Sequence, residues 1–206
     1  MIWPFQRGSV ARDSARLDGW LPRSAWMLER HTIDVPLPPA DALDSITGLR
    51  LHDLPMVRVL FKLRGLSTPA GGATTLLHFF STWPFLLLDE ERGREIVGGV
   101  VGPFWQYGFG SLPRFIPDTP GGFREALAEG RMAALANFRA DPVPGGARLW
   151  TETWVHAPAP GQRAAFTAYW LNIGPFSAWI RRMFLRSARA RAVTGMTGGR
   201  VSPLDT

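Results

Sequence analysis

The alternation of apolar and polar residues along the chain is clearest between residues 131 and 140. Every second side chain there is apolar, which is the period of a strand with one buried face. A second strand is predicted from Ala147 to His156, a run rich in Thr, Trp and Val, and a third from Arg163 to Ile173. In the first strand, Met132, Ala134, Ala136 and Phe138 would face inward, and Arg131, Asn137 and Arg139 would face water.

Helical spacing follows Gly174. A single helix from Arg163 to Val193 is the alternative, but it would place Pro175 deep inside, where proline removes a hydrogen bond and clashes with the preceding turn. The sequence therefore predicts a break at Gly174–Pro175 and a long helix from there to about Val193, ending near Gly195. Its apolar stripe would be Phe176, Trp179, Ile180, Met183 and Phe184, with Arg181, Arg182, Arg186 and Arg189 on the opposite side.

The first half of the chain predicts a strand, two short helices, a hairpin and a further short helix. Residues 74 to 83 lie between these elements and show no clear period. The strand is His31 to Leu37, the helices are Ala40 to Leu49 and Leu54 to Leu66, the hairpin joins Phe85–Asp89 to Arg94–Pro103, and the last helix is capped near Thr119 and runs through Ala128.

The segment from residue 14 to residue 28 mixes tryptophan with arginine and has two interpretations. It is either an amphipathic helix that packs across the domain or a segment that lies on a membrane surface. Pro22 interrupts the helical pattern, which favours packing. We divide the chain into an N-terminal extension (1–28), one domain (29–193) and a flexible C-terminal tail (194–206).

Composition narrows the functional classes. The 206 residues, 46% hydrophobic and 19% charged, suit one globular domain, and the absence of cysteine excludes disulfides, thiolate catalysis and Cys-ligated metals. The net charge of +6 comes from arginines scattered along the chain without a recognition motif, so no nucleic-acid partner is predicted. The sequence has no long apolar run and no secretory signal at its start, so a cytoplasmic protein is expected.

The order of the predicted elements resembles the helix-grip fold of the START-like (SRPBCC) superfamily. Short local patterns carry the same resemblance, which covers residues 30 to 193 and looks like a bacterial branch of that superfamily. Trp154 stands where an arginine is expected after Thr-Glu-Thr. The patterns are Glu95-Ile-Val-Gly98, Gly102-Pro-Phe-Trp105, Ala136-Asn-Phe138, Thr151-Glu-Thr153 and Phe166 with Tyr169-Trp170. The resemblance implies an α+β fold in which a curved antiparallel sheet wraps around a long C-terminal helix, with two short helices after the first strand.

The same resemblance implies a site for an apolar small molecule between sheet and helix. The leading hypothesis is a non-enzymatic binding or carrier protein for a lipid, isoprenoid or polyketide-like compound; the alternative at this site is that the same side chains fill the core. The expected lining residues are Met132, Ala134, Ala136, Phe138, Thr151, Thr153, Phe166, Trp170, Trp179, Ile180 and Met183.

Two other functional hypotheses remain open. One is an enzyme of the cyclase or dehydratase type, in which Glu95, Glu152 or Tyr169 transfers a proton. The other is a structural or membrane-surface protein that binds acidic lipids or a partner through the N-terminal Trp/Arg segment and an arginine-faced helix. The sequence does not indicate an oligomeric state.

Candidate catalytic residues are sparse. The four histidines show no metal-binding spacing, no Gly-x-Ser-x-Gly motif occurs, and neither a metal nor a cofactor is predicted. Glu95 and Glu152 each lie in an apolar strand. Either carboxylate faces a cavity, where burial would raise its pKa, or it faces outward and pairs with an arginine, which the alternation of residues 147–156 favours for Glu152. The expected arginine partners are Arg94, Arg148 and Arg163.

Overall fold

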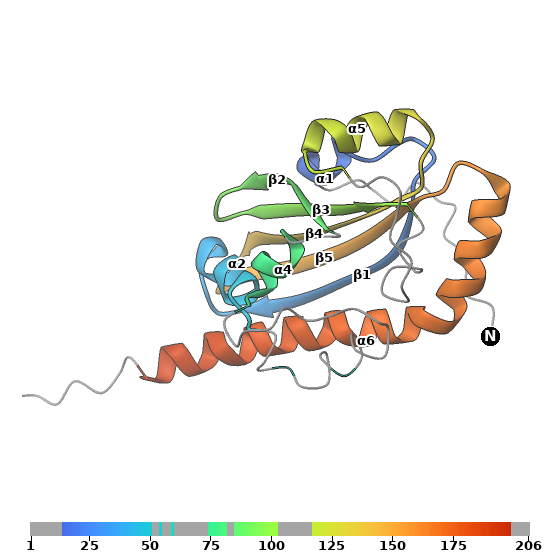
Figure 1. The fold of residues 1–206 in the computed structure, drawn as a ribbon. Helices are drawn as coiled ribbons and strands as arrows, with labels where there is room; N and C mark the ends of the chain where they lie inside the picture. Colours follow the sequence, from blue (N-terminus) through green and yellow to red (C-terminus); the bar gives the residue numbers. More distant parts are fainter. Residues whose placement is uncertain are drawn as a thin grey trace, which may run out of the picture.

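Five antiparallel strands form one curved sheet in the computed structural model, which describes residues 14–50, 54, 59, 74–81, 85–102 and 117–198. The strand order is β1-β5-β4-β3-β2, so the first strand of the chain pairs with the last. The short hairpins β2–β3 and β4–β5 complete the ladder (Figure 1). The strands are β1 (Trp26–Val35), β2 (Leu86–Glu91), β3 (Glu95–Val101), β4 (Ala133–Val143) and β5 (Gly146–His156).

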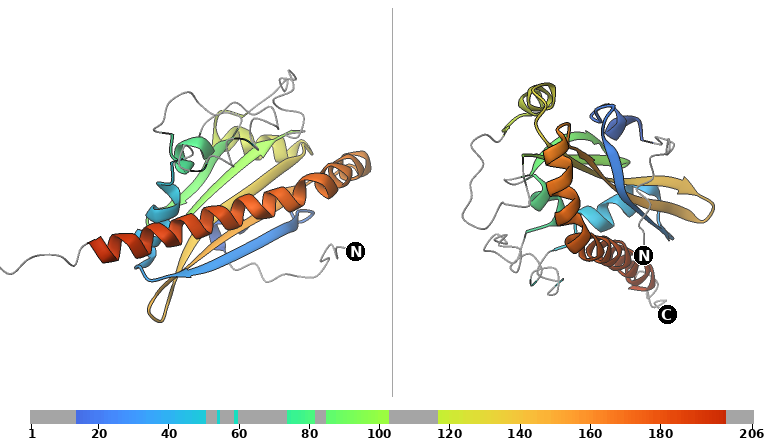
Figure 2. Two further views of the ribbon diagram at one scale, coloured as in Figure 1. Left: turned by 90° about the horizontal axis from the view of Figure 1, so that it is seen from below. Right: turned by 90° about the vertical axis from the view of Figure 1, so that its right-hand side faces the viewer.

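Helices cover both faces of this sheet. The long helix α6 lies on one side, here called the inner face, and α1 and α5 lie on the other, the outer face (Figures 1 and 2). This arrangement confirms the predicted α+β helix-grip fold. The helices are α1 (Ala15–Asp18), α2 (Pro39–Thr47), α4 (Leu76–Phe80), α5 (Pro120–Ala128) and α6 (Pro160–Gly198).

The prediction of a third strand from 163 to 173 is wrong, because α6 already begins at Pro160 and runs through Gly174–Pro175. The carbonyl of Leu171 loses its usual partner, the backbone N–H of residue 175, but Leu171 and Pro175 are exposed, so water can take its place. Figure 1 shows α6 bending in this part of its length. The helix also continues past the predicted stop at Gly195, as far as Gly198.

Other boundaries differ from the sequence interpretation by a few residues. The segment 14–28 is not one helix, because α1 has only four residues and Trp26–Leu28 already belong to β1. The strand β4 continues through Asp141–Pro142, and Gly145 (φ +82°) makes the turn into β5. The predicted hairpin with Gly93 (φ +73°) and the predicted start of α5 are confirmed.

Two helices were predicted directly after the first strand, Ala40–Leu49 and Leu54–Leu66. The first agrees with α2. The second, Leu54–Leu66, falls almost entirely outside the described residues. Residues 76–80, for which the sequence showed no clear period, form α4.

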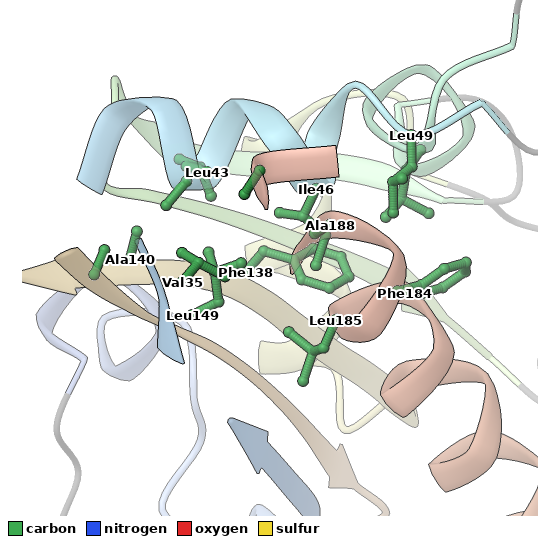
Figure 3. Close-up of a cluster of buried hydrophobic side chains, with 14 of the residues drawn as sticks. Val35, Leu43, Ile46, Leu49, Phe138, Ala140, Leu149, Phe184, Leu185 and Ala188 are labelled. Carbon is green, nitrogen blue, oxygen red and sulfur yellow. The ribbon is translucent and has the colours of Figure 1, made fainter. Parts of the chain in front are cut away.

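The main apolar core lies between the inner face, α2 and the C-terminal half of α6 (Figure 3). Phe138 and Leu149 contribute from the sheet, Ile46 from α2, and Phe184 and Leu185 from α6. Ile46 and Leu149 are fully buried. We call this group the inner core.

A second apolar core covers the outer face. Leu17 and Trp20, from the N-terminal segment, pack with Phe123 of α5 against Val97 and Leu135. The rings of Trp20 and Phe123 meet edge to face with centroids 6.1 Å apart. Asn137 and Arg139, which were predicted to face water, are instead buried on this face of the sheet. Arg139 pairs with Asp141 and lies over the ring of Trp150.

Gly99 of β3 shows how closely α5 approaches the outer face. A Cβ added there would lie 2.7 Å from the ring of Phe123 and 2.8 Å from Leu88 Cδ1. We expect Gly99→Val to lower the free energy of unfolding by about 1–3 kcal/mol through overpacking, measured by urea denaturation. At Gly161, in the first turn of α6, a Cβ meets nothing within 4 Å. Gly161→Ala is therefore the control, and an equal loss in both variants would contradict this account.

Candidate functional site

A buried ion pair joins β1 to α6 on the inner face. Arg181 Nε lies 3.2 Å from Glu29 Oε1, and the two side chains are only 11% and 8% exposed. Arg181 was predicted to lie on the solvent side of the helix, and this prediction is wrong. Residues 177, 181, 185 and 188 follow one another at helical spacing along the side of α6 that faces the sheet, so Arg181 occupies an inward position between Ser177 and Leu185.

Four further polar side chains complete this group. Ser177 Oγ donates to Glu29 Oε1 at 2.6 Å, and His31 Nε2 lies 3.0 Å from Glu29 Oε2. Because a carboxylate only accepts, His31 is the donor in that contact. Arg181 Nη1 donates to Thr151 Oγ1, and Thr153 Oγ1 lies 3.4 Å from Glu29 Oε1. We call the group the Glu29–Arg181 cluster; its members are Glu29, His31, Thr151, Thr153, Ser177 and Arg181.

The electrostatics of this cluster favour the ionised carboxylate. Burial alone would raise the pKa of Glu29, but the hydrogen bond from His31, the charge of Arg181 and the hydrogen bond from Ser177 together hold its pKa below the ordinary value of 4.5. Burial lowers the pKa of Arg181, against the charge and hydrogen bond of Glu29. Two opposite charges are thus held between sheet and helix, each compensating the other.

Aromatic side chains adjoin the cluster toward the beginning of α6. Phe166 is fully buried, stacks on Trp170 with centroids 5.7 Å apart and meets Trp26 edge to face at 6.3 Å. Tyr169 lies 6.0 Å from Phe166, centroid to centroid. Val155 of β5 and Met132, the residue just before β4, pack here, whereas Trp26, Ala134, Tyr169 and Trp170 remain partly exposed. We call this group the aromatic group.

The structure places nine of the eleven predicted lining residues in three groups. Met132, Ala134, Phe166 and Trp170 belong to the aromatic group; Phe138, Ile180 and Met183 belong to or pack against the inner core; Thr151 and Thr153 belong to the Glu29–Arg181 cluster. Ala136 lies on the same inner face, paired with Thr153, and is partly exposed. Trp179 is 40% exposed and lies in none of these groups.

Sequence reasoning missed four members of the cluster: Glu29, His31, Ser177 and Arg181. His31 shares its side of β1 with Ile33 and Val35, so the alternation could have placed it inward. Glu29 was missed because the predicted strand began at His31, although Glu29 continues the same alternation two residues earlier. Arg181 and Ser177 carry no such signal, since arginine and serine on a helix usually face water.

Glu95 and Glu152 lie on the outer face, opposite the Glu29–Arg181 cluster, and both are buried. Asn137 Nδ2 donates to Glu95 Oε1 at 2.7 Å, and Ser14 Oγ donates to the same atom at 2.5 Å. Glu152 Oε1 lies 2.9 Å from Arg30 Nε. Burial raises the pKa of Glu95, although the hydrogen bonds from Ser14 and Asn137 and the charge of Arg139 oppose this.

The partners of these carboxylates differ from the predicted ones. Arg94 pairs with Glu91, Arg148 pairs with Asp34, and Arg163 donates to the carbonyl of Ala157. Trp154, which stands where an arginine was expected, donates its Nε1–H to Glu152 Oε2 at 2.9 Å. A polar contact to Glu152 therefore survives with tryptophan at this position.

Two further findings concern the described ranges as a whole. No three His, Asp or Glu side chains within these ranges lie close enough together to hold a metal ion. Among the helices described, none combines the length and the apolar character needed to cross a bilayer.

Comparison with known proteins assigns no family. No family matches the chain, and no curated protein matches it. Among solved structures, that of Ara h 8.0201 has a TM-score of 0.39 at 8% identity and covers 82% of this chain and 99% of its own. Protein MLL2253 from Mesorhizobium loti has a TM-score of 0.36 at 13% identity, with coverages of 81% and 96%. Because both TM-scores are below 0.5, the fold is assigned from the strand order and α6 alone, and the candidate site from its residues.

Proposed function

We propose that this chain binds a small apolar molecule with one polar end group, between the inner face of the sheet and α6. The polar end lies at the Glu29–Arg181 cluster, and the apolar body lies along the aromatic group. The molecule is of the lipid, isoprenoid or polyketide-like class, and the chain belongs with the START-like helix-grip proteins that its sequence resembles.

The Glu29–Arg181 cluster carries this proposal. Removing a carboxylate and a guanidinium from water costs several kcal/mol per ion, and their mutual attraction repays this only when their geometry is good. Apolar side chains in these positions would stabilise the fold at least as well. Hydroxyl, imidazole and guanidinium groups gathered at one buried place supply the few placed polar groups that orient a ligand in an otherwise apolar site.

The sheet next to this cluster supports the same proposal. Ala134 and Ala136 are small, and both remain partly exposed although they lie on the inner face. Gly98 pairs with Ala136 across β3 and β4 and has no side chain to fill the space. Trp26, Tyr169 and Trp170 also keep part of their surface accessible. Small residues beside partly exposed aromatic rings leave apolar area for a ligand to cover.

A bulky residue at position 136 tests the apolar part of the site. N-phenyl-1-naphthylamine, a neutral probe that fluoresces in apolar surroundings, is titrated into the purified chain. We expect the wild type to bind it and Ala136→Trp to bind it at least about tenfold more weakly, a loss of about 1.4 kcal/mol of binding free energy. The control is Ala164→Trp on the exposed side of α6. Absence of wild-type binding, together with a ligand-free mass by native mass spectrometry, would refute the proposal.

The polar part of the site is tested in the same assay by competition with oleic acid. Thr153→Val keeps the shape of the side chain and removes its hydroxyl. We expect oleic acid to bind this variant about two- to tenfold more weakly, as for one lost hydrogen bond, with binding of the neutral probe unchanged. Glu95→Gln, on the outer face, is the control for both ligands. If Thr153→Val weakened the binding of oleic acid and of the neutral probe equally, the proposed contact between the polar end group and the cluster would be refuted.

A further inference from the structure

The side of α6 that faces away from the sheet carries large apolar residues next to free positive charge. Leu171, Phe176 and Trp179 are 64%, 51% and 40% exposed. One and two turns beyond Trp179, Arg182 and Arg186 are also exposed. Leu171, Trp179, Arg182 and Arg186 lie on one side, because residues 171, 175, 179, 182 and 186 recur at helical spacing, and Phe176 lies beside this row. We call Leu171, Phe176, Trp179, Arg182 and Arg186 the α6 outer surface.

The charge of this helix has one sign. Between Pro160 and Gly198 the chain contains six arginines and no aspartate or glutamate. Arg181 pairs with Glu29 inside the fold. Arg163 donates to the carbonyl of Ala157, and Arg191 donates to the carbonyl of Gly48. Within the ranges that the structure describes, Arg182 and Arg186 have no carboxylate partner. Their charge is thus available to an outside group.

We propose that the α6 outer surface binds the surface of an anionic lipid membrane, with the helix lying in the plane of the headgroups. Leu171, Phe176 and Trp179 would enter the boundary between headgroups and acyl chains, where aromatic rings are favoured. Arg182 and Arg186 would contact lipid phosphates, and each basic residue near such a surface adds about fivefold to the affinity. This inference does not depend on a ligand in the proposed site.

The residue types favour a membrane over other partners. Binding to nucleic acid through phosphates would have no use for three exposed apolar side chains beside these arginines. A second copy of the chain would bring Arg182 and Arg186 near like charges. The N-terminal segment is a weaker candidate among the described residues, because its apolar side chains Leu17, Trp20 and Leu21 are buried in the fold.

Vesicle flotation of the full chain tests this proposal. Phosphatidylcholine vesicles with phosphatidylglycerol should carry the wild type upward at low salt, and pure phosphatidylcholine vesicles should not. We expect Phe176→Ser/Trp179→Ser to abolish flotation, and Arg182→Glu/Arg186→Glu to weaken it by at least about 20-fold, two steps of about fivefold. Arg92→Glu/Arg94→Glu makes the same charge change in the β2–β3 turn and should retain most of the binding.

Three outcomes would overturn the proposal. The first is equal loss in the turn variant and the arginine variant of α6, which would assign binding to net charge alone. The second is flotation that is lost in Trp3→Ser/Phe5→Ser and kept in the α6 variants, which would assign it to the N-terminus. The third is a dimer in solution that Phe176→Ser/Trp179→Ser dissociates, which would make the surface an interface between two copies.

Discussion

Arg181→Met is expected to lower the free energy of unfolding by about 3–5 kcal/mol, because it leaves the buried carboxylate of Glu29 without its counter-charge. Urea denaturation at neutral pH measures this loss. The control is Arg148→Met, which breaks a two-contact pair with Asp34 at the surface, at 2.6 and 2.9 Å. An exposed pair contributes far less than a buried one because solvent screens it, so similar losses in the two variants would contradict the burial argument.

A second substitution separates charge from packing in the same pair. Glu29→Gln removes the unpaired charge, so Arg181→Met/Glu29→Gln should be more stable than Arg181→Met alone. The stability that the Glu29 carboxylate contributes is present above the ordinary pKa of 4.5 and is lost as the pH falls through the lower pKa of the folded state. The advantage of the wild type over the double variant should therefore shrink below about pH 4.5.

Asn137→Leu should have an effect of similar size on the outer face. Asn137 donates to Glu95 at 2.7 Å and accepts the backbone N–H of Glu152 at 2.9 Å. Leucine therefore leaves the buried carboxylate of Glu95 with Ser14 as its remaining hydrogen-bond donor and removes the acceptor of the Glu152 N–H. A buried group without its partner costs about 1–3 kcal/mol, and the weakened carboxylate adds to this, so we expect a marked loss of stability in urea denaturation. The control is Asn172→Leu, since Asn172 is exposed on α6 and bonds the carbonyl of Ala168 in its own helix.

The loss in Asn137→Leu should depend on pH. The pKa of Glu95 is already raised in the folded protein, and removal of a donor raises it further. When the pKa of a carboxyl is higher in the folded protein than in the unfolded chain, the unfolded chain releases the proton first as the pH rises. The free energy of unfolding therefore falls as the pH rises from the pKa of the unfolded chain to that of the folded protein. The variant should therefore lose more stability at pH 7 than at pH 4. A loss independent of pH would separate Asn137 from the titration of Glu95.

The sequence predicted those parts of the fold in which a single local rule decides the structure. Alternation placed the inward residues Ala134 and Phe138 of β4 correctly, because one face of this strand packs against apolar side chains. Thr119 caps α5 as expected, accepting from the N–H of Gly122 at 3.2 Å. Gly93 makes the hairpin turn, because the turn requires a left-handed φ and glycine adopts this conformation without steric cost.

Tertiary contacts overrode the local rules elsewhere. Pro175 predicts a break, yet helix α6 passes through it at an exposed part of its length, where water can bond the carbonyl that loses its partner. Asn137 and Arg139 predict a solvated face, yet α1 and α5 cover that face from distant parts of the chain. Arg181 predicts a surface position, yet its partner Glu29 lies in β1, at the other end of the sequence. No local pattern contains these pairings.

The pairing of β1 with β5 limits the order in which the chain can fold during synthesis. Residues 26–35 have no ladder partner until residues 147–155 have left the ribosome, whereas the hairpins β2–β3 and β4–β5 form from neighbouring segments. Contacts between segments so far apart in sequence form slowly, because a long loop must close before they stabilise anything. The ion pair of Glu29 with Arg181 waits longer still, since α6 is made after β5. The nascent chain therefore carries an unpaired β1, with its apolar residues accessible to chaperones, until β5 has been translated.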